Sequence, residues 1–120
     1  MKCIAFILAA SFVLTVPTFA AEQLTPQQLT SLVASAKTSA EHQRIANYYR
    51  AQADKLLAES NDHARMATTF RANPATNNDK QVYATVNHCE YLAKTLKATS
   101  NKVRAIADDH EQMARVADQR

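Results

Sequence analysis

Two long stretches of the chain carry apolar and small residues at helical spacing. In residues 39–71, and again in residues 79–118, apolar positions recur every three or four residues with polar residues between them. This period predicts amphipathic helices, because a half-buried strand would alternate apolar and polar positions. Both stretches are rich in alanine, glutamine, lysine, arginine and leucine, which favour helix, and the chain contains no glycine. We therefore expect an all-α protein.

A shorter helix is expected before these stretches. Thr25 precedes Pro26, and Gln28 lies three residues after Thr25. This arrangement is typical of a helix start with a capping box and a proline in the first turn. A short helix should therefore run from Pro26 to about Lys37, within an N-terminal segment of residues 21–38.

The ends of the long stretches predict how they are connected. Thr38 and Glu41 form a second capping-box pattern, so the chain either bends near Thr38–Ser39 or continues as one helix. Residues 72–78 contain the only clear helix breaker, and Asn78 or Asp79 should cap the last helix. Because this connection is short, the two long helices should be antiparallel neighbours. Residues 39–120 thus form a helical hairpin, with helices over 39–71 and 79–118.

The second long helix repeats the first at an offset of 47 residues. Asp62-His63-x-x-Met66-Ala67 returns as Asp109-His110-x-x-Met113-Ala114, which indicates duplication of one helical unit. In each helix one heptad row is entirely small, and we name it the small row: Ala46, Ala53, Ser60 and Ala67, with Ala93, Ser100, Ala107 and Ala114. The row four residues earlier, the large row, contains His42, Tyr49, Leu56, His63 and Phe70, with Val82, Cys89, Leu96, Val103, His110 and Ala117. Small residues against large ones should let the helices approach closely.

A third row makes the apolar stripe wider than a two-helix seam requires. It contains Ile45, Met66, Leu92, Ile106 and Met113. Either the short first helix folds back over it, or two hairpins pair into a four-helix bundle. We expect a homodimer, because a lone hairpin of this size buries little core. Another protein of the cell envelope is the alternative partner.

The N-terminus is typical of a cleavable secretory signal. Residues 1–20 combine Lys2, an apolar run and a small-residue end at Ala20, and the run is too short to span a bilayer comfortably. We expect cleavage near Ala20, a periplasmic or secreted protein, and no membrane span afterwards. Cleavage lowers the formal charge from +3 to +2. Because the charges are interspersed, a nucleic-acid partner is not expected.

Two clusters of potential metal ligands follow from the hairpin. If facing residues have numbers that add up to about 151, the first cluster lies near the turn and the second near the open end. The first comprises His63, Met66, His88 and Cys89, and the second comprises His110, Met113, Glu41 and His42. Imidazole with thioether or thiolate suits copper, above all Cu(I), and imidazole with carboxylate suits zinc or Cu(II). Asp62 and Asp109 point about 100° away around the helix and are weaker candidates.

The alternative for both clusters is packing. A seam histidine can be partly buried with one hydrogen bond satisfied, and methionine at helical spacing usually fills a core. Duplication would copy packing residues as faithfully as ligands. Enzyme activity is not expected, because the chain lacks the His-Glu-x-x-His, Cys-x-x-Cys and glycine-rich phosphate motifs. The function classes that stay open are a soft-metal binder or buffer and a structural or interaction module.

His88-Cys89-Glu90-Tyr91-Leu92-Ala93-Lys94, with the Asp109–Ala114 element after it, supports a resemblance. The chain resembles small secreted, alanine-rich helical proteins of Gram-negative bacteria that carry His-Cys-x-x-Leu-Ala and repeated His-x-x-Met-Ala elements. The resemblance covers most of residues 39–117. It implies export and a helical fold, and it implies no activity.

Overall fold

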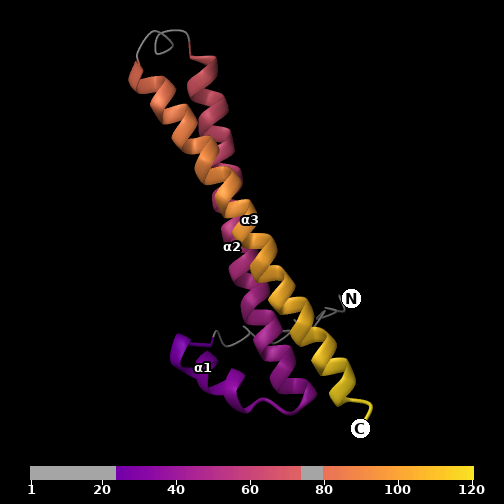
Figure 1. Cartoon of the computed structure of the whole chain (residues 1–120). Helices are drawn as coiled ribbons and strands as arrows, with labels where there is room; N and C mark the ends of the chain where they lie inside the picture. The colour runs from indigo at the N-terminus through magenta and orange to yellow at the C-terminus, as the bar shows by residue number, and fades with distance from the viewer. Residues whose placement is uncertain (1–23, 74–79) are drawn as a thin grey trace, which may run out of the picture.

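The computed structural model describes residues 24–73 and 80–120, which form three helices. They are α1 (Pro26–Ser35), α2 (Ser39–Ala72) and α3 (Lys80–Ala117). Figure 1 shows α2 and α3 side by side along their lengths, with α1 beside the beginning of α2. The predicted all-α antiparallel hairpin with a short leading helix is confirmed. The predicted signal segment, residues 1–20, and the predicted cap at Asn78 or Asp79 lie outside the described residues.

Capping boxes begin the first two helices, as the sequence predicts. Thr25 caps α1 and exchanges hydrogen bonds with Gln28. Thr38 caps α2 in the same way with Glu41. Because α1 ends at Ser35 and Thr38 has extended backbone angles, the chain bends between the helices and does not continue as one. Each box satisfies backbone N–H groups that a helix start leaves without intrahelical partners.

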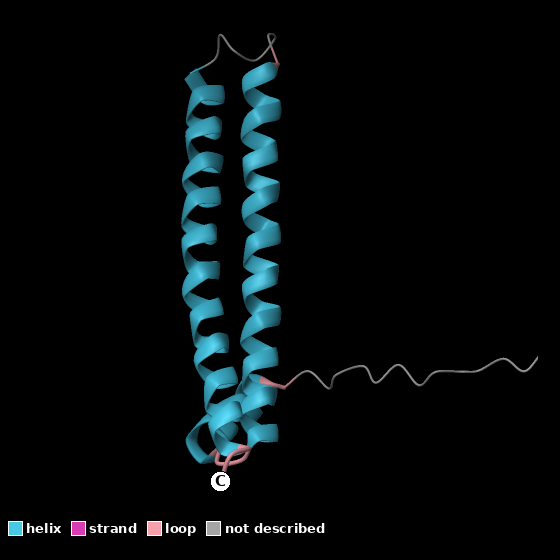
Figure 2. Cartoon of the chain, turned by 90° about the vertical axis from the view of Figure 1, so that its right-hand side faces the viewer, coloured by secondary structure: helices cyan, strands magenta, loops and turns pink. Residues whose placement is uncertain are grey.

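The small row forms the centre of the α2–α3 seam. Its members Ala46, Ala53 and Ala107 are completely inaccessible to solvent. Ser60, Ala67, Ser100 and Ala114 are also buried, and Ala93 is half-buried. Helices whose facing rows carry only a methyl or hydroxymethyl group can approach closely along their whole contact. Figure 2 shows the antiparallel helices α2 and α3 side by side along their lengths.

Two serines connect the helices reciprocally. The Ser60 hydroxyl on α2 donates to the carbonyl oxygen of Ala93 on α3 over 2.7 Å. The Ser100 hydroxyl on α3 donates to the carbonyl oxygen of Ala53 on α2, also over 2.7 Å. The two bonds are related by a local two-fold axis across the seam. Facing residues therefore have numbers that add up to 153 here, about two more than the sequence analysis assumed.

One flank of the seam is charged. Its residues follow the small row by one or four positions, and they pair across the helices. Arg104 contacts Asp54 over 2.6 Å, and Arg50 contacts Asp108 over 3.1 Å. Further ion pairs join Arg50 to Glu111 and Arg71 to Glu90. These pairs are partly exposed, so each contributes about 0–1 kcal/mol to stability, and together they favour this pairing of the helices.

The opposite flank, which precedes the small row by one position, is more apolar and is covered only in part. Ile45, in the first two turns of α2, is completely buried near α1, where Leu24 is also buried. Elsewhere on this flank Met66, Ile106 and Met113 are 38%, 40% and 47% exposed. With its 10 residues, α1 lies at the beginning of α2 (Figure 1) and leaves these three side chains partly uncovered.

Candidate metal-binding site

The open end of the hairpin brings two predicted ligands together. His42 lies in the first turn of α2, and His110 lies two turns before the end of α3. Both belong to the large row, and the register places them opposite each other. Their Nδ1 atoms are 3.1 Å apart, and their ring centroids are 5.4 Å apart. At this distance one neutral ring donates its Nδ1–H to the Nδ1 of the other.

Tyr49 forms one wall of this pair. Its ring lies nearly parallel to the His110 imidazole, with centroids 6.4 Å apart and planes inclined by 20°. Tyr48 contacts Tyr49 edge-on at 5.6 Å. Tyr49 is not among the ligands predicted from the sequence, although it follows His42 by one heptad in the large row. That spacing places it over the same part of α3.

Burial lowers the pKa of His110 below its ordinary value. The facing His42 lowers the pKa of His110 further, and the Asp109 carboxylate raises it by a smaller amount. Both larger effects disfavour the imidazolium, because burial removes water from it and a second positive ring would repel it. His110 is therefore held neutral, which is the form in which an imidazole nitrogen can bind a metal ion.

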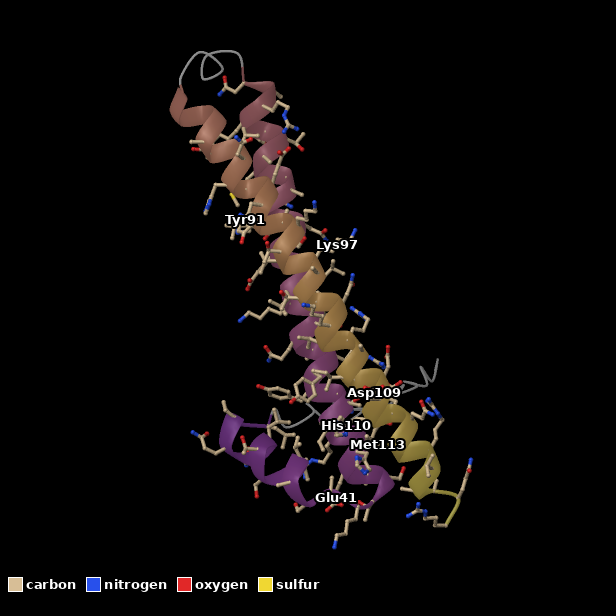
Figure 3. All side chains as sticks on the ribbon, in the orientation of Figure 1. Glu41, Tyr91, Lys97, Asp109, His110 and Met113 are labelled. Atoms are coloured by element: carbon tan, nitrogen blue, oxygen red, sulfur yellow. The ribbon has the colours of Figure 1, made fainter. Side chains whose placement is uncertain are left out.

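A hollow at the open end is lined by one member of the pair, His42. It has a volume of about 750 Å³, and Asp109, Met113 and the cationic side chains of Lys37 and Arg120 also line it. Met113 lies one helical turn after His110, and Figure 3 shows the two side by side at the open end. Half-exposed Met113 thus faces solvent in the hollow that His42 also lines.

Glu41, also predicted as a ligand, takes part in the N-terminal capping box of α2. Its Oε2 accepts hydrogen bonds from the backbone N–H groups of Lys37 and Thr38 and from the Thr38 hydroxyl, each over 2.9 Å. The two backbone hydrogen bonds, followed by the hydroxyl, lower the pKa of Glu41 from its ordinary 4.5 to about 2. Glu41 stabilises the start of the helix that carries His42, and its role as a ligand stays a prediction.

The cluster predicted near the turn is less closely assembled. Cys89 is buried and packs with Ala67 and Val86. The Nδ1 atom of His63 is buried and has no hydrogen-bond partner within the described part of the chain. The seam register places Cys89 in the layer of His63, rather than His88 as the sequence analysis assumed. His88 is exposed, and Met66 is 38% exposed.

The ligands available determine which metals suit the site. Across residues 24–73 and 80–120, no three side chains of histidine, cysteine, aspartate or glutamate converge as a metal-binding group. The facing pair does fit two metal bonds, because nitrogens bound to one tetrahedral ion at about 2.0–2.1 Å lie about 3.3 Å apart. The observed 3.1 Å is close to that separation. The pair can therefore supply two ligands after small rotations of the rings.

Comparisons with family models, with curated proteins and with solved structures yield no match to this chain. The resemblance to secreted helical proteins stays an expectation. No helix in the described part of the chain has an apolar stretch long enough to cross a membrane.

Proposed function

We propose that this chain is an exported metal-binding protein that holds a copper or zinc ion at the open end of its hairpin. The observation that carries the proposal is the 3.1 Å contact between the Nδ1 atoms of His42 and His110. Export follows from the signal-like residues 1–20. A small periplasmic protein of this kind would buffer the metal rather than catalyse a reaction.

The geometry favours binding for a second reason. The two histidines come from opposite ends of the hairpin sequence, but the Ser60 and Ser100 contacts fix the register that joins them. Because the folded seam already brings both imidazoles together, binding requires little further ordering of the chain. The unfolded chain has no such site, so bound metal stabilises the folded state.

Thermal unfolding tests the proposal. At about 100 times the dissociation constant, a ligand of the folded state adds about 2.7 kcal/mol, which raises the Tm of a domain of this size by roughly 10–20 °C. Either Cu(I) or Zn(II) should give this shift, and the double variant His42→Ala, His110→Ala should lose it. The exposed His88→Ala is the matched control and should keep it. An unchanged shift in the double variant would refute the proposal.

A second function is favoured by the difference between the two flanks. The charged flank is joined by ion pairs, whereas Met66, Ile106 and Met113 are exposed on the other. A second hairpin packed on this apolar flank would form a four-helix bundle, and the flank would then serve as an interaction surface. An envelope protein with an amphipathic helix is the alternative occupant.

Sedimentation measures whether the chain self-associates, and it therefore distinguishes an interaction module from a monomeric metal-binding protein. Ile106→Glu should weaken self-association, because it introduces a charge at the centre of the apolar flank. Exposed Ala105→Glu is the matched control one residue away, and it should leave association unchanged. A wild-type chain that stays monomeric at high concentration argues against the homodimer.

A further inference from the structure

We infer that the open-end site is selective for Cu(I), with the Met113 thioether as its third ligand beside His42 and His110. This inference rests on the proposed metal-binding function and names the ion and the residue that distinguish it. Its basis is the position of Met113, which lies in one hollow with His42 and one helical turn from His110.

The exposure of Met113 does not fit a core-filling role. Methionine at helical spacing usually fills gaps in a core, but 47% of Met113 is exposed. It follows His110 by three residues, so both side chains lie on the same face of α3. Figure 3 shows Met113 next to His110 on α3 at the open end, and Met113 shares the lining of one hollow with His42. The thioether is therefore available to an ion at the histidine pair from the side that solvent reaches.

Two carboxylates near the His42–His110 pair already have partners. Glu41 accepts the backbone hydrogen bonds that cap α2, and Glu111 pairs with Arg50. Asp109 lines the hollow, but it forms no metal-binding group with the two histidines. The hollow beside His42 thus holds one thioether, Met113, and one carboxylate, Asp109, and the carboxylate is tested below by Asp109→Asn.

This ligand set discriminates between ions. Thioether sulfur binds Cu(I) well and adds little for Zn(II), which prefers imidazole, thiolate or carboxylate. Two imidazoles with one thioether satisfy the low coordination number that Cu(I) accepts. Zn(II) at the same place would have two protein ligands, or three if the Asp109 carboxylate also bound it. Removal of the thioether should therefore weaken Cu(I) binding and leave Zn(II) binding almost unchanged.

The experiment measures Cu(I) affinity in the full chain without oxygen, by competition with a chromophoric Cu(I) chelator, and Zn(II) affinity with a zinc indicator. Met113→Leu keeps the side-chain volume and removes the sulfur. We expect at least a tenfold loss of Cu(I) affinity and less than a twofold change for Zn(II). Met66→Leu is the matched control, because Met66 holds the equivalent position in α2, three residues after His63. It should change neither affinity.

The outcomes separate this inference from the proposed function. If Met113→Leu binds Cu(I) as tightly as wild type, or if Asp109→Asn lowers Zn(II) affinity tenfold, the Cu(I) selectivity is overturned while metal binding at the pair stands. If Met66→Leu or Cys89→Ser causes the tenfold loss, Cu(I) binds near the turn and the inference is wrong. If His42→Ala leaves both affinities intact, the proposed function fails as well. X-ray absorption of the Cu(I) form should show a copper–sulfur shell that Met113→Leu removes.

Discussion

The Nδ1 atoms of His42 and His110 face each other at 3.1 Å across the open end of the hairpin, 68 residues apart in the chain. No covalent link joins α2 and α3 at this end, because the connection between them lies at the opposite end. The contact thus adds to the seam at the end where no chain connection joins the two helices. A metal ion bound to both rings would strengthen this contact.

The small row predicts a sharp difference between two identical substitutions. Ala107 is completely buried opposite Ala46, and Ala105 is exposed on the outer face of α3. Ala107→Leu should force the helices apart and lower the free energy of unfolding by about 2 kcal/mol or more. Ala105→Leu should change it by less than about 0.5 kcal/mol. Urea denaturation measures both, and equal effects would contradict the close seam.

The reciprocal serine bonds predict a smaller loss. Ser100→Ala removes the hydrogen bond to the Ala53 carbonyl and should cost about 1 kcal/mol. Thr99→Ala is the control, because the Thr99 hydroxyl is exposed and bonds to Thr95 within its own helix. Its variant should be close to wild type in chemical denaturation. A Ser100→Ala protein as stable as wild type would show that the bond across the seam contributes nothing.

The α2 cap predicts a loss of helix in acid. The folded-state pKa of Glu41, about 2, lies below its ordinary 4.5. Its contribution to stability is therefore fully present above pH 4.5 and is lost as the pH falls toward 2. Glu41→Gln should flatten this part of the pH profile, as measured by far-UV circular dichroism. If the variant and wild type lose helix identically over this range, the carboxylate does not stabilise the cap.

The histidine pair predicts a second pH dependence at milder acidity. The pKa of His110 is lowered in the folded state from its ordinary 6.5. Stability from this group is present above pH 6.5 and declines as the pH falls below it, because the unfolded chain then binds the proton more readily. In a chelating buffer, the Tm of wild type should fall more than that of His110→Gln as the pH drops below about 6.5. Parallel curves would contradict burial of a neutral His110.

Periodicity is enough to predict the fold, because in this chain it shows both where the helices lie and which faces of them meet. The small row predicts the seam residue by residue, and Thr25 and Thr38 predict the helix starts. The bend at residues 36–38 stayed open, because a capping box can lie beside a continuing helix as well as a break. The register was misplaced by one or two residues, because the turn alone fixes it loosely. The Ser60 and Ser100 bonds fix it in the structure.

The candidate site was less predictable than the seam. Heptad rows place His42 and His110 in one layer, so their pairing follows once the register is known. The capping box predicts the role of Glu41 at the start of α2, whereas the ring contact of Tyr49 depends on side-chain rotamers, which a row does not specify. His88 is exposed although Cys89 beside it is buried, because only Cys89 lies in the large row. Neighbours on a helix point about 100° apart, and a one-residue change in register exchanges them.

Metal binding at the open end is tested most directly by nitrogen-15 NMR of the histidine side chains during titration with Cu(I), which is diamagnetic. The Nδ1 resonances of His42 and His110 should shift together and saturate at one equivalent. The exposed His88 should stay unchanged over the same range. If the His42 and His110 signals do not move, or if His88 responds first, the open end of the hairpin is not a metal-binding site.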